Sequence, residues 1–303
     1  MDLDSYNSVR SGGGGFVAMP RGLIAVWGTE AVQFLDGMIT NDMKTLEDGG
    51  QMLAAFPNAQ GRLLALVRVL RQGDRFLIET EEATREAVFN NLFKFTFAGD
   101  FFVEDLSDKF RFFEIFGEVA KNHEDQEGLV FSTGRNPGIF VPASAADDFR
   151  SELNEKNVVE ISGELYETLR VESGIPKYGV DMDETTIVPE IGLDGLISYT
   201  KGCYIGQEII ARIHFRGHVA KQLTGLYLPE ISVLEGESLS GEELTTADGK
   251  NAGKITSAAF SPTLESFIAL AYVRYHNLAE GTEVYINGKK AIVKNLPFAG
   301  TFV

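Results

Sequence analysis

The stretch Lys201-Gly-Cys-Tyr-Ile-Gly-Gln-Glu208 is the most distinctive part of this 303-residue chain, because it holds the single cysteine, Cys203. Gly202 and Gly206 bracket this cysteine, and glycine permits positive φ or a close backbone approach. A helix over residues 205–213 would place Cys203 near its positive end with Lys201 beside it, and both effects raise a cysteine's thiolate fraction. The stretch therefore indicates a reactive thiol. The alternative is a buried cysteine that packs as a small hydrophobic residue.

The sign of the charge reverses just after this segment. The whole chain carries a net charge of -17, which repels phosphate backbones, so bulk nucleic-acid binding is not expected. From Ile209 to Pro229 there is no Asp or Glu, and the basic residues in that stretch are Arg212, His214, Arg216, His218 and Lys221. The stretch is either a solvated basic surface or a place where a small anion binds.

A second segment upstream, Arg170-Val-Glu-Ser-Gly-Ile-Pro-Lys-Tyr-Gly-Val-Asp181, also carries candidate chemistry. A helix that begins at Ser162 should end by Gly174, which leaves Glu172 near its last turn. The helix dipole does not favour a carboxylate there, so Arg170, Lys177 or a ligand must do so. A carboxylate can accept two parallel hydrogen bonds from an N–H and an adjacent amino group. The alternative is a surface glutamate paired with an arginine.

The pattern of apolar residues and turns predicts an α+β architecture rather than a doubly wound sheet. The first fifteen residues are glycine-rich at their end and are expected to form a flexible tail. Thr29 and Thr80 are expected to cap two helices that each follow a strand. After Lys221, five or six short strands in about eighty residues predict a small closed antiparallel barrel.

Composition argues against zinc-binding, secreted and membrane-spanning classes of protein. One cysteine and four histidines cannot supply a structural zinc site of the usual cysteine-rich kind, so no metal site is expected. No secretory signal is visible, and the longest apolar runs, such as Leu63 to Val67, are too short to span a bilayer. We therefore expect a cytoplasmic protein without a membrane partner.

The two motif segments together resemble the YgfZ/GcvT folate-binding family, which includes the glycine cleavage system T protein (an aminomethyltransferase) and YgfZ-type proteins of iron–sulfur cluster assembly and tRNA modification. Residues 201–208 resemble the YgfZ signature K-G-C-[YF]-x-G-Q-E, and residues 170–181 resemble R-x-E-x-G-x-P-x-Y-G-x-D. The likeness extends from about residue 16 to the end.

The resemblance implies a three-domain cloverleaf around a central channel that holds tetrahydrofolate. Its domains would be a discontinuous folate-binding domain (1–48 and 107–218), an inserted α+β domain (49–106) and a C-terminal β-barrel (219–303). Glu172 would anchor the pterin, and Cys203 with Lys201 would carry the reactive step. Further candidates for the folate site are Arg170, Tyr178, Arg212 and Arg216.

One departure separates this chain from the aminomethyltransferases it resembles. Those enzymes have a segment like N-x-x-G-G-I-x-D-D, whose carboxylate lies beside the folate nitrogen. The corresponding stretch here runs from Asn58, and Ala65 and Leu66 stand where the two acids would be. Neither side chain can move a proton or stabilise a cation.

The resemblance and this departure favour a folate-binding protein that supports iron–sulfur cluster assembly or repair, with assembly proteins or client enzymes as partners. A lone cysteine cannot hold a cluster, which usually needs four protein ligands, so its role would be shared, transient or redox. The rivals are a tetrahydrofolate-dependent aminomethyltransferase, with a carboxylate from elsewhere such as Asp42, and a scaffold without ligand. Whether the chain catalyses a reaction stays open.

Overall fold

The computed structural model describes residues 2–11, 13–117, 128–133, 136–231 and 238–298. These residues form two compact units. We call the first the N-terminal unit; its described part comprises residues 2–117, 128–162 (with the gaps just given) and 194–209. The second, the barrel unit, comprises residues 163–193 and 210–298, with the gap at 232–237. Each unit has its own hydrophobic core.

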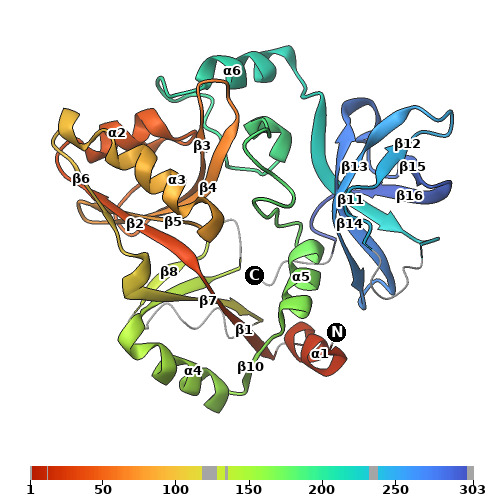
Figure 1. Ribbon diagram of the computed structural model, residues 1–303, viewed down its shortest axis with the longest axis horizontal. Helices are drawn as coiled ribbons and strands as arrows, with labels where there is room; N and C mark the ends of the chain where they lie inside the picture. Colours follow the sequence, from red (N-terminus) through yellow and green to blue (C-terminus); the bar gives the residue numbers. More distant parts are fainter. Residues whose placement is uncertain (1, 12, 118–127, 134–135, 232–237, 299–303) are drawn as a thin grey trace. The chain divides into compact units, whose positions relative to one another are not determined.

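The first sheet of the N-terminal unit has the strand order β10-β1-β7-β9-β8. Its strands are β1 (Gly14–Met19), β7 (Phe110–Phe116), β8 (Leu129–Phe131), β9 (Gly138–Pro142) and β10 (Val158–Glu160). Strand β1 lies between β7, with which it pairs antiparallel, and the edge strand β10, with which it pairs parallel (Figure 1). Helix α4 (Ala146–Glu155) packs Phe149 and Leu153 against this sheet.

The prediction of a flexible tail over the first fifteen residues was wrong. Residues Leu3–Arg10 form helix α1, whose N-cap Asp2 accepts hydrogen bonds from the backbone N–H groups of Asp4 and Ser5. Tyr6 and Val9 are buried. Two of the glycines that indicated flexibility, Gly14 and Gly15, instead start β1, where a Cβ on Gly15 would clash with Val9. Glycine here serves close packing.

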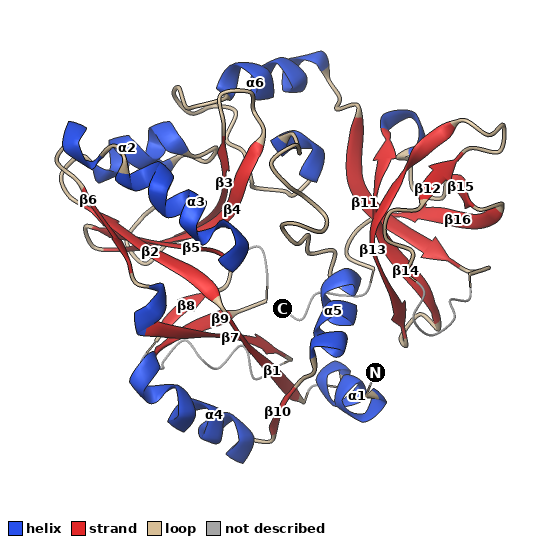
Figure 2. Ribbon diagram, viewed as in Figure 1, coloured by secondary structure: helices blue, strands red, loops and turns tan. Residues whose placement is uncertain are grey.

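The second sheet of the N-terminal unit has the order β3-β4-β5-β2-β6. Its strands are β2 (Arg21–Trp27), β3 (Gln51–Pro57), β4 (Leu63–Gln72), β5 (Arg75–Glu81) and β6 (Phe102–Asp105). Helix α3 (Glu82–Phe93) lies across one face of the sheet, and α2 (Ala31–Met38) precedes β3 (Figure 2). Strand β2 pairs with β5 and β6, so this sheet joins residues from both sides of the domain boundary expected at 48/49.

The two helix caps predicted for threonine were wrong. The N-cap of α2 is Glu30, and the Thr29 hydroxyl donates instead to the Asp100 carboxylate at 2.7 Å. The N-cap of α3 is Glu81, and Thr80 shares a hydrogen bond with Thr84. Thr29 is thus engaged with a residue 71 positions away, and Thr80 with a residue of α3 itself.

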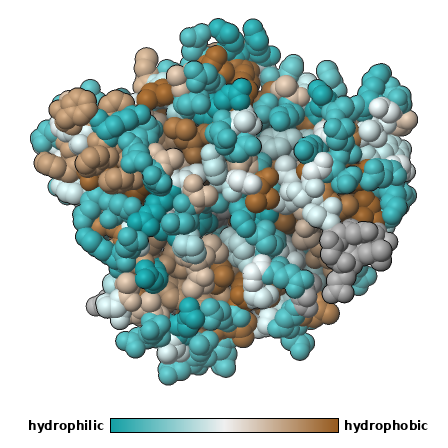
Figure 3. Space-filling view, in the orientation of Figure 1, coloured by the Kyte–Doolittle hydropathy of each residue, from teal (hydrophilic) through white to brown (hydrophobic). Residues whose placement is uncertain are grey.

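Hydrophobic side chains gather on the surface of the N-terminal unit over the end that carries α2, α3 and β6 (upper left in Figure 3). The exposed aromatic residues of this region lie at the end of α3, in the 3-10 helix η2 (Thr96–Ala98) and in β6; they are Phe93, Phe97 and Phe102. Phe102 stacks on Trp27 with 5.6 Å between ring centroids.

The barrel unit confirms the predicted closed antiparallel barrel, with the strand order β11-β14-β13-β12-β15-β16 (Figure 2). Its strands are β11 (Lys221–Leu228), β12 (Glu243–Thr245), β13 (Asn251–Ser261), β14 (Ser266–Arg274), β15 (Glu283–Ile286) and β16 (Lys289–Lys294). Helix α5 (Gly163–Glu172) packs against β13 and β14, with Val171 beside Ile268 and Leu270.

The remaining elements are short or connect the units. Helix α6 spans Gln207–Arg216, two to three residues later than predicted. The other 3-10 helices are η1 (Met43–Thr45), η3 (Ser107–Lys109), η5 (Ala143–Ala145), η6 (Val188–Ile191) and η7 (Tyr275–Asn277). Over the residues described, the helices all fall short of the length and apolar character needed to cross a membrane.

Candidate functional site

The predicted site residues divide between the two units. Lys201 and Cys203 belong to the N-terminal unit. The predicted folate-site residues all belong to the barrel unit; they are Arg170, Glu172, Tyr178, Arg212 and Arg216. Each group is therefore described within its own unit.

Glu172 is the last residue of α5 and has no exposed surface. Ser261, at the end of β13, donates its hydroxyl proton to Glu172 Oε1 at 2.5 Å. The backbone N–H of Phe298 donates to the Glu172 carbonyl at 2.9 Å. Burying a carboxylate without hydrogen bonds costs free energy. The end of α5 does not stabilise this charge, and the barrel strand β13 supplies a hydrogen-bond donor to it.

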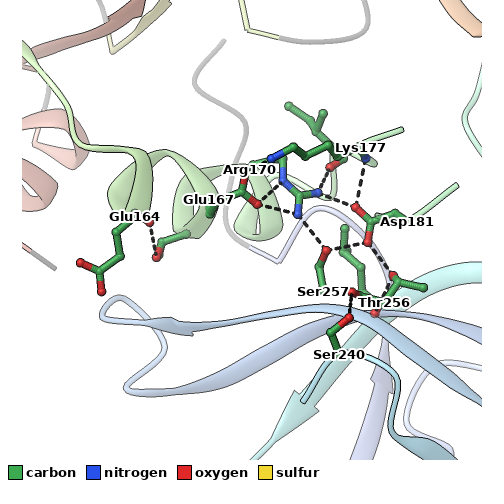
Figure 4. Close-up of polar contacts among 11 residues, drawn as sticks. Glu164, Glu167, Arg170, Lys177, Asp181, Ser240, Thr256 and Ser257 are labelled. Atoms are coloured by element: carbon green, nitrogen blue, oxygen red, sulfur yellow. Dashed lines mark hydrogen bonds and ion pairs between the residues drawn. The ribbon is translucent and has the colours of Figure 1, made fainter. Parts of the chain in front are cut away.

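The arginine and lysine expected to support Glu172 have other carboxylate partners. Lys177 pairs with Glu167 at 2.7 Å, and Arg170 pairs with Glu167 and Asp181 (Figure 4). The physical reason is the helix geometry: Glu167 lies three residues before Arg170 and so faces the same side of α5.

Arg170 is enclosed in a network of hydrogen bonds that joins α5 to the barrel strands (Figure 4). Its side chain is 2% exposed and that of Asp181 0%. The guanidinium donates to Asp181 Oδ2 (2.7 Å), to Ser257 Oγ (2.8 Å) and to the Ile175 carbonyl (2.7 Å). Asp181 Oδ1 also accepts from Ser257 at 2.7 Å and from Thr256 at 2.5 Å. These contacts make Arg170 a structural element of the unit.

The other three predicted folate-site residues are more accessible. Tyr178 is half-buried in the turn after α5, and burial raises its pKa above the ordinary value. Arg212 and Arg216 are exposed on α6. Phe215 beside them is 83% exposed. Three of the five basic residues of the 209–229 stretch, Arg212, His214 and Arg216, are therefore exposed on this helix.

Lys201 is buried and closes the C-terminal end of α2. Its ammonium group donates to three backbone carbonyls, those of Asp36 (2.7 Å), Ile39 (3.0 Å) and Asn41 (2.5 Å). The Asp36 carboxylate is 3.2 Å away. A cation at this position satisfies orphan carbonyls and complements the negative end of the helix dipole.

Burial and neighbouring charge shift the pKa values of Lys201 and Asp36 in opposite directions. Desolvation lowers the pKa of Lys201 despite the nearby Asp36 carboxylate. For Asp36, burial opposes ionisation, but the hydrogen bond from Lys44 and the charge of Lys201 together hold its pKa below the ordinary value. Burial also raises the pKa of Tyr204 to about 12, and the Lys201 ammonium lies 5.2 Å from its ring centroid.

Cys203 is exposed, on a loop that is fixed on both sides. Before it, Lys201 is held by its three hydrogen bonds; after it, the N–H of Ile205 donates to the Gly37 carbonyl at 3.0 Å. Helix α6 begins only at Gln207, whose side chain donates to the Gly202 carbonyl at 3.2 Å. The loop thus presents the thiol to solvent on a fixed backbone.

Gly206 explains why the cysteine motif needs its second glycine. Its φ is +81°, a conformation that side chains disfavour. A Cβ at this position would clash with the carbonyl of Asn58 and would also crowd Gly61. The turn between β3 and β4 therefore lies directly against the cysteine loop.

The stretch that lacks the aminomethyltransferase acids continues from this turn. Ala65 is fully buried in β4, in the same core as Phe56 and Val67. Leu66 is half-buried. A carboxylate at position 65 would sit in an apolar core, where its charge would have no partner.

Sequence reasoning missed three residues that complete these arrangements. Ser261 and Asp36 bind side chains far away in sequence, 89 and 165 residues from their partners. Lys44 pairs with Asp36 at 3.1 Å, and its ammonium lies 3.9 Å from the place a Cβ on Gly202 would occupy. An exposed cation, Lys44, therefore lies beside the cysteine loop. The one signal in the sequence that could have indicated Lys44 is its position directly after Asn41-Asp42 and Met43.

Comparison with known protein families defines the class. A model of the GCVT N-terminal domain matches residues 3–123, and one of the glycine cleavage T-protein C-terminal barrel domain matches residues 221–298. The chain belongs to the GcvT-like folate-binding family.

Its relatives in this family carry different names. The aminomethyltransferase of Bdellovibrio bacteriovorus is 27% identical over 97% of this chain and 90% of its own length. The mitochondrial iron–sulfur cluster assembly factor IBA57 homolog of Mycosarcoma maydis is 25% identical over 80% of this chain and 70% of its own. The tRNA-modifying protein YgfZ of Hamiltonella defensa is 30% identical over 67% and 66%, respectively.

A solved structure confirms the expected fold. The glycine cleavage system aminomethyltransferase T from Bartonella henselae matches with a TM-score of 0.82 and 23% identity, over 94% of this chain and 86% of that one. The aminomethyltransferase-like α+β fold with a C-terminal barrel is therefore established. At this identity the likeness concerns the fold.

Proposed function

We propose that this chain is a tetrahydrofolate-binding protein of the YgfZ type that supports iron–sulfur cluster assembly or repair. In this proposal Glu172 anchors the pterin and Cys203 acts on the cluster. Two relatives, named as an iron–sulfur cluster assembly factor and as YgfZ, support this direction. Whether the chain also turns over a substrate is left to experiment.

The exposure of Cys203 on a fixed loop is the observation that carries the proposal. Cysteine coordinates iron as a thiolate, formed when the thiol gives up its proton, and an exposed cysteine can be reached by a metal that a partner protein holds. Four protein ligands usually hold a cluster, so the partner supplies the others and Cys203 is a shared, transient ligand. Lys201 is assigned a positioning role, since its ammonium protons are engaged with backbone carbonyls.

The end of α5 offers groups that suit a pterin. Glu172 has two carboxylate oxygens that can accept hydrogen bonds from a ring N–H and an adjacent amino group. The buried Oγ of Ser173, the next residue, has no hydrogen-bond partner among the described residues. Folate would supply a one-carbon carrier there. Arg212 and Arg216 are proposed to meet the anionic tail of the ligand, and Tyr178 to pack beside it.

Aminomethyl transfer is less well supported by the residues near the cysteine loop. Ala65 lies in the apolar core, so no carboxylate is available at that position. Asp42, the alternative acid, caps η1 by accepting a hydrogen bond from the Lys44 N–H at 3.0 Å. A group already used as a cap is poorly placed to exchange protons with a substrate.

The test separates binding from cluster chemistry with two variants. Cys203→Ala should leave tetrahydrofolate affinity within about twofold, and should abolish the ability of the chain to restore an iron–sulfur enzyme in cells that lack it. Glu172→Gln should weaken tetrahydrofolate binding. Affinity is measured by anaerobic calorimetry. Absence of binding at micromolar concentration, or equal loss of both properties in Cys203→Ala, would count against the proposal.

A further inference from the structure

Helix α6, which follows the cysteine loop, buries little of its own surface. Of its 10 residues, only Ile210 is buried. Phe215, in its last turn, is 83% exposed. A helix on the surface of a folded domain ordinarily buries a stripe of apolar side chains, whereas α6 leaves its largest apolar ring in solvent. Since single exposed apolar residues are common in monomeric proteins, the charges around this ring have to be considered with it.

The side chains around Phe215 are basic. Arg212 lies three residues before it and therefore on the same face of the helix, and Arg216 follows it directly; both are exposed. The single acid of α6, Glu208, lies in the first turn, where the helix dipole favours it. No further Asp or Glu occurs up to Pro229, although the whole chain carries a net charge of -17. The face that holds Arg212, Phe215 and Arg216, the Phe215 face, is therefore aromatic and positively charged in an acidic chain.

The start of α6 is attached to the cysteine loop. The Gln207 side chain donates to the carbonyl of Gly202, the residue before Cys203, at 3.2 Å. Phe215 lies eight residues after Gln207, about 12 Å along the helix axis. The surface that one partner contributes to an ordinary protein–protein interface, about 800 Å², is roughly 30 Å across. A protein that docks on the helix is therefore large enough to extend to its first turn and to the loop bonded to that turn.

We infer that the Phe215 face is the docking surface for the protein that shares the iron–sulfur cluster with Cys203, and that the matching surface of this protein is acidic. The inference rests on the proposed role of Cys203 as a shared cluster ligand. Aromatic and arginine side chains contribute much of the binding energy at protein interfaces, and the Phe215 face supplies both. Opposite charge on the partner speeds encounter and fixes the orientation of docking, which a transient cluster ligand requires.

Charge distinguishes this partner from the other possible occupants. A nucleic acid extends phosphates over much of the surface, and a chain with a net charge of -17 repels them. A second copy of the chain would bring the same net charge and, in a symmetric dimer, the same basic face. A folded partner with an acidic patch needs only the charges at the point of contact to be complementary.

The first test uses two variants that both remove the ring and differ in charge. Phe215→Asp should lower the restoration of an iron–sulfur enzyme in cells that lack the chain by about tenfold, and Phe215→Lys by about threefold, because an acidic partner repels only the first. Phe97→Asp is the matched control, since Phe97 is 89% exposed on η2 of the N-terminal unit, and it should stay within about twofold of the parent. Equal losses in the two Phe215 variants, a larger loss in Phe215→Lys, or a loss in Phe97→Asp as large as that in Phe215→Asp would overturn the inference.

The second test identifies the occupant directly. A photoreactive benzoylphenylalanine is placed at position 215 of the full chain and, as the control, at position 97, and the cells are irradiated. Position 215 should give a product that position 97 does not give. In that product an iron–sulfur-cluster-binding protein should be attached through a peptide in which Asp and Glu outnumber Lys and Arg. A missing product, a product that nuclease digests, or a product formed by two copies of the chain would overturn the inference.

The outcomes separate the docking surface from the function on which it rests. If Cys203→Ala abolishes restoration while Phe215→Asp restores the enzyme like the parent, the docking surface is overturned and the proposed function stands. If Cys203→Ala restores the enzyme like the parent, both fall. Circular dichroism and melting temperature establish that each variant is folded.

Tetrahydrofolate affinity separates the docking surface from the folate tail, which Arg212 and Arg216 are proposed to meet. In both Phe215 variants this affinity should stay within about twofold of the parent, because the ring is not part of the proposed folate site. A loss of affinity that parallels the loss of restoration would assign the Phe215 face to folate and would overturn the inference.

Discussion

At the scale of single residues, the structure distinguishes charged side chains that hold the fold together from a side chain that is accessible for chemistry. Lys201 was predicted to share the reactive step with Cys203, and Arg170 was predicted to bind folate. Each is buried with its donors directed at protein oxygens. A buried donor without a hydrogen-bond partner costs more free energy of folding than a single solvent-exposed hydrogen bond contributes. Cys203 differs, because its side chain is exposed.

The buried ammonium of Lys201 should therefore be essential for stability. Lys201→Met keeps the length of the side chain but removes the ammonium group from three backbone carbonyls and the Asp36 carboxylate. The free energy of unfolding should therefore fall by about 3–5 kcal/mol. Lys44 contacts the same Asp36 carboxylate from a side chain that is 63% exposed. Lys44→Met should therefore cost below about 1 kcal/mol.

Urea denaturation followed by circular dichroism measures both values. Similar losses in the two variants would show that the burial of Lys201 does not matter. Such a result would reopen a direct role for its ammonium at the cysteine.

At the scale of elements, the cysteine loop is fixed by contacts to the end of α2 and to the turn before β4. The N–H of Ser198 donates to the Thr40 carbonyl at 3.0 Å, and the Thr40 hydroxyl donates to the Leu196 carbonyl at 2.6 Å. Together with Lys201 and Ile205, these bonds connect the loop to residues 36–41 from several directions. The loop conformation is consequently a property of the N-terminal unit as a whole.

Gly206 is the position where this packing tolerates no side chain. Gly206→Ala should lower the free energy of unfolding by more than the roughly 1–2 kcal/mol of a left-handed residue, because its Cβ would also displace the β3–β4 turn. Gly217→Ala is the control: φ there is +92°, but nothing lies within 4 Å of the added Cβ. It should show the conformational cost alone.

The rate at which iodoacetamide alkylates native Cys203 gives a second readout. Gly206→Ala should change this rate, and Gly217→Ala should leave it unchanged. Equal alkylation rates in all three proteins would mean that the turn does not control the cysteine loop.

At the scale of the whole molecule, the two units have separate cores and distinct buried ion pairs. The Arg170–Asp181 pair belongs to the barrel unit, whereas the single tryptophan, Trp27, belongs to the N-terminal unit. Units with their own cores can unfold in separate steps. Trp27 fluorescence therefore reports on one unit, and circular dichroism reports on both.

Asp181→Asn should destabilise the barrel unit by about 3–5 kcal/mol, because it leaves the buried Arg170 guanidinium short of a countercharge. We expect an earlier transition by circular dichroism with little change in the midpoint seen by Trp27. Asp248→Asn removes an exposed pair with Lys250 from the same barrel and should shift neither probe. An equal shift of both probes in Asp181→Asn would contradict separate unfolding.

The sequence by itself determined the features that depend on local pattern. Alternating apolar residues and turn glycines after Lys221 predicted the barrel, and residues 170–181 and 201–208 indicated the family. They left open whether Cys203 is accessible or buried, and the structure shows it exposed. Short strands such as those of the barrel can be predicted from local sequence, because side chains alternate across a strand within a few residues.

Only the tertiary structure decided which polar groups are partners. Glu172 is bound by Ser261, Lys201 by the end of α2, and β1 by strands from residues 110–160, none of which is near in sequence. Burial makes each of these pairings obligatory, since a polar group removed from water must find a partner inside the fold. Sequence spacing carries no record of which distant partner that is.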